Sequence, residues 1–296
     1  MSDFICRFDA YFQDHIVYPF IKKWILRNLK IKSTGETIEY ILKNKCSVSR
    51  YGDGEFDMIQ GGSRGFQDQN IDLAIRLKNI LVSDDTLNHI VCIPYTLKCT
   101  NHLRDYAYYF WKSYTERNYK RLLPLLNLNK TYYDAMISRF YMDYKDKTEC
   151  GNVINQLKEI WKDRDVVIVE GCYTISGIGN DLYAGVKSLR RIICPAENSY
   201  SKYDEIIEAV RVSATKNDLI LICLGMTATV LAYDLANDGY QAIDMGHLDV
   251  EYEWYLHKVE KKVKLPNRYV NEVNGGNKVQ RCNDPVYLSQ IIAEII

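Results

Sequence analysis

The stretch that decides the fold starts with the apolar run Asp165-Val166-Val167-Ile168-Val169 and continues to Ile243. Three similar runs follow it: Arg191-Ile192-Ile193-Cys194, Asp218-Leu219-Ile220-Leu221-Ile222-Cys223 and Tyr240-Gln241-Ala242-Ile243. Segments with the apolar spacing of helices separate the runs, and a short helix is expected before Arg191. Strands that alternate with helices, and that are apolar on both faces, indicate a parallel sheet covered on both sides. The sequence therefore predicts an α/β fold with a mainly parallel sheet and helices on both faces.

The rest of the chain follows this pattern less regularly. Short apolar runs that end at polar residues or at proline predict strands at 46–49 and 89–93. Helical spacing predicts helices over 37–42, from 56 onward, and over 73–81, 100–128, 153–162, 203–213 and 227–236. A last helix is expected near Asp249, and the tail from Lys258 has the composition of a loop. We divide the chain into an N-terminal extension, residues 1–34, and one α/β domain, residues 35–296.

Composition excludes several classes of protein. Lys plus Arg and Asp plus Glu both total 38, so the overall positive field of a general nucleic-acid binder is missing, and we expect no nucleic-acid partner. The nine cysteines form no C-x-x-C pair, which fits a reducing compartment. Neither a signal peptide nor an apolar run of about 18 residues is found. These features predict a cytoplasmic protein.

The first 32 residues are rich in aromatic and basic side chains, and no acid lies between Lys22 and Lys32. A basic, aromatic segment of this kind can lie on a bilayer, which would make the protein peripheral at the inner face of a membrane. The other interpretation is a helix that docks on the domain or on a second copy of the chain, because aromatic stripes at helical spacing more often pack in a core.

Arg50-Tyr51-Gly52-Asp53-Gly54-Glu55 is the first candidate site. It is expected to be a loop between a strand and a helix, with Gly54 turning the backbone so that Asp53 and Glu55 can share a ligand and Gly52 allowing close approach of a bound group. Two carboxylates suit a hard divalent cation, which proteins commonly hold together with substrate phosphates. The alternative is an exposed Asp-Gly turn.

Polar clusters follow the other predicted strands, and the carboxyl ends of parallel strands meet at one sheet edge, where ligands bind. They are Glu170-Gly171 with Gly177–Asp181, Leu224–Thr229, and Asp244–Asp249. Gly225-Met226-Thr227-Ala228-Thr229 has the form of a phosphate site at a helix N-terminus, although Thr227 could simply cap that helix. A P-loop motif is missing, and Leu182 stands where a dinucleotide fingerprint needs its third glycine.

The cluster after the last predicted strand offers a histidine and several acids. His247 could be a buried histidine, or it could join Asp244 and Asp249 in a metal shell. Asp249, Glu251 and Glu253 open a helix, where acids complement the dipole, and one of them could accept a proton from a substrate hydroxyl. A carboxylate pair, a phosphate turn and a spare base together suggest transfer of a group away from a diphosphate, as in nucleotide-sugar reactions.

Several separated motifs carry a resemblance to a known family. They are Arg50–Phe56, Gly177-Ile178-Gly179-Asn180-Asp181-Leu182, Arg191–Pro195, Leu224–Ala232 and Gly246–Trp254. In this order, over about residues 36–273, the chain resembles the GT-D-type bacterial glycosyltransferases, some of which extend glycans on serine-rich repeat adhesins while others sit in polysaccharide clusters.

The resemblance implies a Rossmann-like fold and an Asp-x-Glu motif, Asp53 and Glu55, that binds a divalent metal, manganese or magnesium, and a UDP-sugar. His247 is a further metal candidate. Asp249 or Glu253 is the expected base if the reaction inverts the anomeric centre, and the sequence leaves open whether it inverts or retains. The candidates for holding the donor are Arg50, Gly52, Asn180, Asp181, Gly225, Thr227, Ala228, Thr229 and Asp244. One departure from the family pattern is Thr174-Ile175, where a Ser-Arg pair is expected.

The sequence thus predicts a metal-dependent glycosyltransferase that moves a hexose from a UDP-sugar to a glycan or glycoprotein acceptor. A metal-dependent phosphohydrolase is the alternative enzyme, because the same acids would serve it. The non-enzymatic alternative is a subunit that binds a nucleotide-sugar without turnover.

Overall fold

The computed structural model describes residues 18–84, 86 and 88–296. Its sheet has nine strands, all pairing in parallel, in the order β1-β4-β3-β2-β8-β7-β5-β6-β9. The strands are β1 (Lys30–Ile31), β2 (Ser47–Arg50), β3 (His89–Ile93), β4 (Thr131–Asp134), β5 (Asp165–Gly171), β6 (Ser188–Cys194), β7 (Leu219–Cys223), β8 (Gln241–Asp244) and β9 (Ile291–Glu294). The predicted α/β class and parallel sheet are therefore confirmed.

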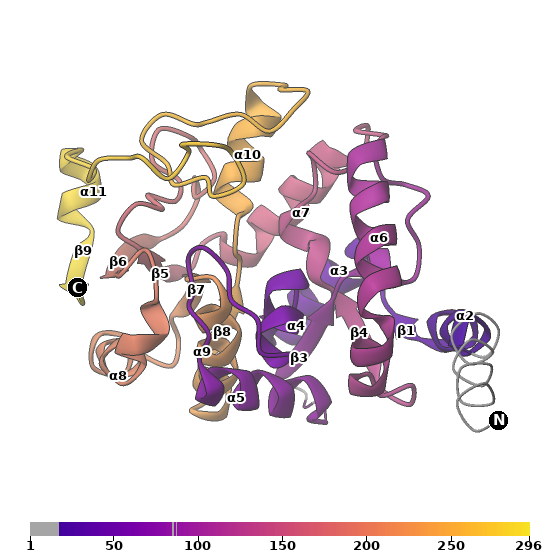
Figure 1. Ribbon diagram of the computed structural model, residues 1–296. Coiled ribbons are helices and arrows are strands. Elements are labelled where there is room, and N and C mark those ends of the chain that lie inside the picture. Colours follow the sequence, from indigo (N-terminus) through magenta and orange to yellow (C-terminus); the bar gives the residue numbers. More distant parts are fainter. Residues whose placement is uncertain (1–17, 85, 87) are drawn as a thin grey trace, which may run out of the picture.

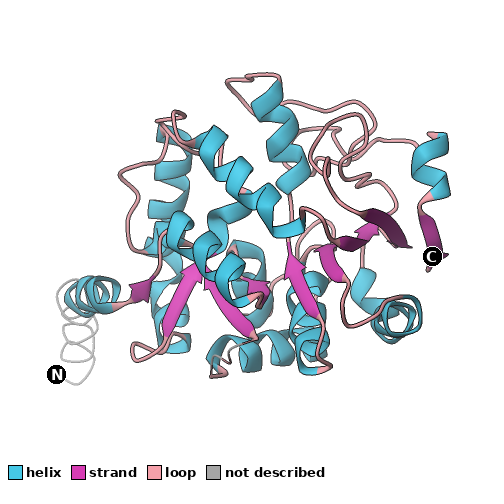
Figure 2. Ribbon diagram, turned by 180° about the vertical axis from the view of Figure 1, so that it is seen from behind, coloured by secondary structure: helices cyan, strands magenta, loops and turns pink. Residues whose placement is uncertain are grey.

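Helices cover both faces of this sheet (Figures 1 and 2). They are α2 (Tyr18–Asn28), α3 (Thr34–Asn44), α4 (Asp53–Ile59), α5 (Ile71–Val82), α6 (Asp105–Leu122), α7 (Cys150–Trp161), α8 (Tyr203–Ser213), α9 (Met226–Asn237), α10 (Leu248–Leu256) and α11 (Pro285–Ser289). Short 3-10 turns add η2 (Tyr95–Leu97), η3 (Leu123–Leu125), η4 (Ala135–Ser138) and η5 (Ser199–Lys202).

The side chains of the central strands alternate between two cores. Val167 and Val169 of β5 join one core with residues of α4, α5, α6, α8 and α9, whereas Val166 and Ile168 join the other with residues of α3, α7 and α10. Successive side chains of a strand point to opposite faces, so a continuous apolar run supplies both cores at once. This explains why the runs between Asp165 and Ile243 are apolar throughout.

The structure departs from the predicted elements at three places: the link between β5 and β6, the tail, and the Asp-Gly-Glu motif. The link between β5 and β6, residues 172–187, consists of turns, and the short helix expected there was wrong. The tail from Lys258 is not loop throughout. It contains α11 and β9, and β9 is the edge strand beside β6. The sheet also gains β1 and β4, which are too short, or too rich in tyrosine, to stand out in the sequence.

The third departure concerns the Asp-Gly-Glu motif itself. Residues 53–55 form the first turn of α4 rather than a loop, and Gly54 does not have the positive φ that we expected. Gly52 is the N-cap, and the Glu55 carboxylate reaches back to its backbone N–H at 2.7 Å. This bond is one half of the capping box of a helix start, since Gly52 has no side chain to complete it, and it explains the motif's form better than a turn does.

Helix α2 docks on the domain at one edge of the sheet, next to β1 (Figure 1). Lys22 pairs with Glu116 of α6, and Ile25 and Leu26 pack against the core, as the docked-helix interpretation expects. Phe20 and Trp24 remain exposed. The earlier aromatic residues, up to Tyr11 and Phe12, lie outside the described residues. No described helix has the length and apolar character needed to span a bilayer.

Candidate active-site cleft

A cleft of about 910 Å³ opens at the carboxyl edge of the sheet. It lies where β2 and β8 pair, and these strands join the β1–β4 half of the sheet to the β5–β9 half. Such a junction in a parallel sheet is where ligands bind. Of the predicted site residues, these line the cleft: Arg50, Gly52, Asp53, Glu55, Gly225, Asp244 and His247.

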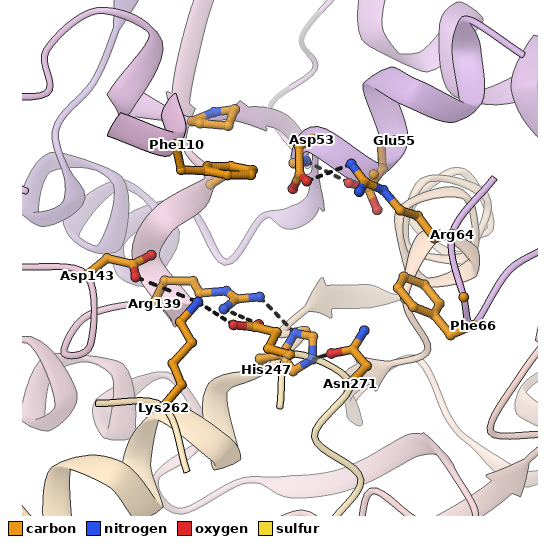
Figure 3. A pocket seen from close by; sticks show the side chains of 18 of the residues that line it. Asp53, Glu55, Arg64, Phe66, Phe110, Arg139, Asp143, His247, Lys262 and Asn271 are labelled. Carbon is orange, nitrogen blue, oxygen red and sulfur yellow. Dashed lines mark hydrogen bonds and ion pairs between the residues drawn. The ribbon is translucent and has the colours of Figure 1, made fainter. Parts of the chain in front are cut away.

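The Asp53 and Glu55 side chains lie together on one wall of the cleft (Figure 3). The Asp53 carboxylate is about one-third exposed, whereas Glu55 is engaged by the Gly52 N–H. Burial raises the pKa of Glu55 to about 7, with a further contribution from the nearby carboxylates of Asp244 and Asp53. A cation bound between Asp53 and Glu55 would favour the ionised form of Glu55 and offset the repulsion between the two carboxylates.

Arg64 lies across this acidic wall. Its Nη2 is 2.6 Å from Oδ2 of Asp53 and 2.5 Å from Oδ2 of Asp57, and the hydroxyl of Tyr114 donates to Oδ1 of Asp57 at 3.0 Å. We call Asp53, Asp57 and Arg64 the open cluster, because all three side chains are about 30% exposed. Sequence reasoning missed Arg64, whose only local signal is its place in the glycine-rich segment 61–65.

Arg50 and Asp244 form the floor of the cleft. The guanidinium of Arg50 contacts the Asp244 carboxylate at 2.9 Å and donates to the Asp244 carbonyl, to the Ala135 carbonyl and to the Ser138 hydroxyl. Burial raises the pKa of Asp244 although Arg50 opposes that shift. A Cβ on Gly246, which has a φ of +49°, would lie 2.0 Å from Nη2 of Arg50, so this packing requires glycine there. Arg50 is therefore held by the protein and ties the two halves of the sheet together.

The opposite wall carries a mixed charge cluster that the sequence did not reveal (Figure 3). Arg139 and Lys262 both pair with Glu272. Burial alone would raise the pKa of Glu272, but Arg139, His247 and Lys262 outweigh it and hold that pKa below its usual range. These residues come from segments far apart in the chain, and only the fold brings them together.

His247 belongs to that opposite wall rather than to the acidic one. Its Nδ1 lies 3.1 Å from Nη2 of Arg139 and its Nε2 lies 3.2 Å from Oδ1 of Asn271. Burial and the charge of Arg139 lower the pKa of His247 to about 4, so the ring is neutral at pH 7. In the part of the chain that the structure describes, no three His, Cys, Asp or Glu side chains gather as a metal site, so His247 does not join Asp53 and Glu55 in one.

The predicted phosphate turn meets the cleft only at Gly225. Its φ is +52°, and Phe66 packs so closely that a Cβ on Gly225 would lie 2.7 Å from the ring. Thr227, Ala228 and Thr229 are buried behind it. The Thr229 hydroxyl donates to the Arg50 carbonyl at 2.9 Å, and that of Thr227 accepts from Ser199 at 3.0 Å. The Thr229 hydroxyl therefore supports the floor, the Thr227 hydroxyl bonds to Ser199, and neither residue lines the cleft.

The other predicted residues form a separate cluster that does not line the cleft. Arg268 donates to Asp249 at 2.5 Å and lies 3.1 Å from Glu253, and the Asn180 amide donates to both acids. We call Asp249, Glu253 and Arg268 the closed cluster, because none of the three side chains is more than 10% exposed. Asp181 lies nearby on the surface, paired with Lys158 at 2.9 Å.

Aromatic side chains complete the rim of the cleft. Phe110, Tyr106 and Trp111 of α6 line one side, and Phe66 stands on the other (Figure 3). The Tyr106 hydroxyl donates to Asp143 at 2.6 Å, and Phe110 stacks on Tyr114, which reaches the open cluster. Exposed aromatic faces beside charged groups suit a ligand that has both flat apolar surfaces and polar edges.

The donor set of the acidic wall fits a divalent cation in part. Two carboxylate side chains are available there, and among the described residues Oδ1 of Asp53 accepts no hydrogen bond. A cation held by one or two carboxylates takes its remaining ligands from substrate phosphates and water. Asp53 and Glu55 are thus sufficient for a cation that arrives with a diphosphate, but they do not form a complete protein cage.

A protein-family model described as the glycosyltransferase GT-D fold matches residues 48–273 of this chain. A probable glycosyl transferase, Gly, of Streptococcus gordonii is 37% identical over 269 residues, which are 91% of this chain and 39% of that protein. The glycosyltransferase GlyD of Streptococcus pneumoniae serotype 4 is 35% identical over 268 residues, 90% of this chain and 33% of that protein. The chain therefore spans well under half the length of these relatives.

Two solved structures have the same fold as this chain. One is a domain described as having a distinct glycosyltransferase fold. It superposes with a TM-score of 0.89 at 38% sequence identity, and the match covers 94% of this chain and 99% of the chain in that structure. The other is described as a new glycosyltransferase from Streptococcus sanguinis, with a TM-score of 0.87 at 37% identity over 90% of this chain and 100% of its own.

Proposed function

The chain belongs to the family of the GT-D glycosyltransferase fold, and we propose that it moves a hexose from a UDP-sugar to a glycan or glycoprotein acceptor with the help of a divalent metal. The observation that carries this proposal is the position of Asp53 and Glu55. They occupy the first turn of α4 and line the cleft at the carboxyl edge of the sheet, beside Gly225 at the start of α9. Carboxylates next to a helix N-terminus suit a metal-bound diphosphate.

In this proposal, different residues bind the metal, support the floor of the cleft and contact the sugar. Asp53 and Glu55 would hold manganese or magnesium, and the bound cation would stabilise the charge that develops on the leaving diphosphate. Arg50 and Asp244 keep the floor rigid through their mutual ion pair. Phe110 and Tyr106 offer faces against which a sugar ring can pack.

An acceptor hydroxyl also needs a base within hydrogen-bond reach. Asp249 and Glu253 were predicted for this step, but both are engaged by Arg268 and lie outside the lining of the cleft. Either would have to leave the closed cluster to reach an acceptor. Their role as bases stays a prediction from the sequence, whereas their buried contacts with Arg268 favour a structural role, and a variant of Asp249 separates the two below.

The decisive experiment is UDP release over a panel of UDP-sugars, with manganese, with magnesium and with a chelator. We expect one UDP-hexose to be turned over, release to rise when a glycan acceptor is added, and the chelator to stop it. Release of inorganic phosphate from nucleotides without an acceptor would favour the phosphohydrolase instead. Binding of UDP, seen as a thermal shift, without turnover of any donor would favour a non-catalytic subunit.

We further propose that the protein works in the cytoplasm. The cysteines of the described residues are free, and several are buried, which suits a reducing compartment. The exposed Phe20 and Trp24 on the basic helix α2 would then be available for a membrane surface or a second copy of the chain. Sedimentation with anionic vesicles, and the oligomeric state of a variant with both aromatics changed to serine, would separate these two partners.

A further inference from the structure

We infer that Arg64 is a counter-cation built into the donor site. It neutralises Asp53 and Asp57 while the cleft is empty, and it leaves them for the diphosphate when a nucleotide and a divalent cation bind. The inference rests on the proposed function, because it names how this chain takes up that donor. It assigns a binding role to a residue that lies outside the Asp-x-Glu motif.

The position of Arg64 supports the first half of this inference. A single nitrogen of its guanidinium contacts both carboxylates, at 2.6 Å and 2.5 Å. A cation that binds Asp53 must therefore share or displace that nitrogen. The pair is about one-third exposed, and ion pairs that water can reach contribute only about 0–1 kcal/mol to stability. The contact places a positive charge beside the carboxylate, which opposes the binding of a cation there, and it is weak enough to exchange.

The backbone around Arg64 is fixed, so the side chain alone can move. Arg64 and Gln67 exchange two backbone hydrogen bonds, at 2.8 Å and 3.0 Å. The carbonyl of Phe66 accepts from the N–H of Asn198 at 2.9 Å, and the Asn198 side chain accepts from the N–H of Asp68 at 2.7 Å. The Arg64 stem crosses Gly54, where an added Cβ would lie 3.8 Å from it. The guanidinium can therefore change position by rotation about the side-chain bonds while the backbone of Arg64 stays in place.

Comparison with the other arginines of the cleft identifies Arg64 as the one available for a ligand. Among the described residues, three arginines line the cleft: Arg50, Arg64 and Arg139. Arg50 is bound to Asp244, Ala135 and Ser138, and Arg139 to Glu272 and His247. Arg64 is the most exposed of the three. A guanidinium also matches the geometry of phosphate oxygens.

The neighbours of Arg64 indicate where the diphosphate would lie. Phe66, two residues on, packs over Gly225 at the start of α9, and both residues line the cleft with Arg64. A diphosphate between Asp53 and Gly225 would meet the bound cation on one side and the start of α9 on the other. A Cβ added to Gly54 would lie 3.8 Å from the Arg64 side chain and 3.1 Å from that of Met226, the first residue of α9, so a rotation of the Arg64 side chain would bring the guanidinium toward that space.

This exchange couples the two ligands. Without a nucleotide, a cation must compete with Arg64 and binds weakly. With a nucleotide, Arg64 gains new oxygen partners and releases Asp53, so each ligand raises the affinity of the other by the same factor. Removing the guanidinium should therefore change metal and nucleotide binding in opposite directions.

The test measures manganese binding and UDP binding by titration calorimetry, with and without the other ligand, in the protein of residues 1–296. We expect Arg64→Met to bind manganese alone about tenfold more tightly than the wild type and to bind UDP about tenfold more weakly. In the wild type, UDP should tighten manganese binding about tenfold. In Arg64→Met this coupling should be weaker, because only the direct contact between the cation and the diphosphate remains. Arg64→Lys, which keeps the charge, should lie between the two.

Arg211→Met is the matched control, because Arg211 pairs with Asp238 on the surface and does not line the cleft. It should leave both affinities unchanged. If the wild type binds both ligands and Arg64→Met changes neither affinity, or weakens both, Arg64 is not the counter-cation and the proposed function stands. If the wild type binds neither manganese nor UDP, the proposed function fails, and this inference fails with it.

Discussion

Two clusters among the described residues carry the same charges, an arginine and two carboxylates, in opposite surroundings. In the open cluster, Arg64 joins Asp53 and Asp57, and each side chain is about 30% exposed. In the closed cluster, Arg268 joins Asp249 and Glu253, and the exposed fractions are 4–10%. Asp53 and Arg64 of the open cluster line the cleft, whereas no member of the closed cluster does.

The difference between the clusters is one of solvation. Water screens the open cluster, so its ion pairs are weak and its acids can exchange partners. The closed cluster is buried away from water. Removing the charge of Arg268 would therefore leave two buried carboxylates without a compensating cation. The same three charges therefore favour ligand binding at one place and rigidity at the other. The predictions below test this contrast.

The largest effect is expected from Asp53→Asn in the open cluster. It removes the exposed carboxylate of the proposed metal site, and loss of a group that stabilises the leaving diphosphate should lower the rate of sugar transfer about a thousandfold, roughly 4 kcal/mol. The midpoint of thermal unfolding should stay within about two degrees of the wild type. Glu39→Gln, at an exposed acid on α3, is the control. Full activity of Asp53→Asn would remove the metal hypothesis.

Arg268→Met in the closed cluster should lower the stability of the protein, whereas Asp53→Asn lowers the rate of transfer at unchanged stability. It leaves Asp249 and Glu253 buried without their cation, so the free energy of unfolding should fall by about 3 kcal/mol. Urea denaturation followed by circular dichroism measures this. Arg211→Met, at an exposed pair, should cost less than about 0.5 kcal/mol. Equal stability of the two variants would mean that the closed cluster is no more structural than a surface pair.

Asp249→Asn distinguishes a structural role from the predicted catalytic one. The amide can still accept from the Gly177 N–H, which lies 2.8 Å away, but it loses the charge that faces Arg268. We expect stability to fall by about 2 kcal/mol while the transfer rate per folded molecule stays within about fivefold of the wild type. A rate that drops about a thousandfold at unchanged stability would instead establish Asp249 as the base.

A third acid on α10 shows what happens when a buried carboxylate has no arginine bonded to it. Burial raises the pKa of Glu251 from its ordinary value of 4.5 to about 7, although Arg139 opposes that shift. Its Oε2 accepts from the N–H groups of Tyr141 and Met142, and its Oε1 has no hydrogen-bond partner among the described residues. The folded protein therefore holds the Glu251 proton more tightly than the unfolded chain does.

The sign of the resulting pH dependence follows from that pKa. The contribution of Glu251 to stability is fully present below about pH 4.5 and is lost as the pH rises through 7. Glu251→Gln removes this dependence, so its stability relative to the wild type should rise by up to about 2 kcal/mol between pH 5 and pH 8. Urea denaturation of both proteins at these two pH values measures it. A difference that is constant with pH would show that Glu251 titrates normally.

Much of the fold followed from local patterns. The runs at Asp165, Asp218 and Tyr240 predicted strands that the structure places within one or two residues, because a continuous apolar run is a property of neighbouring residues. The expected loop at Asp53 was wrong for a local reason as well, since Glu55 three residues after Gly52 is also the pattern of a helix start. The edge strand β9 was missed because so short a strand depends on its partner, β6.

The candidate site could be predicted only in part. The sequence identified Asp53 and Glu55, and the parallel sheet implied that residues after its strands meet at one edge. It could not rank those residues by exposure. Asp53 directly follows Gly52 and Asp249 lies three residues after Gly246, and both are near a strand end. Yet Asp249 is buried against Arg268, whereas Asp53 lines the cleft. Arg139, Lys262 and Glu272 have no shared local signal at all.

The sequence by itself determined the class of fold, the order of its motifs and the acids that can carry the chemistry, because these depend on residue type and on short-range spacing. Tertiary structure decided which acids meet solvent and which arginine each one faces. Those choices depend on contacts between segments up to about 200 residues apart, such as Arg50 with Asp244, and on the burial that sets each charge's energy. Solvation thus separates two clusters that the sequence presents as alike.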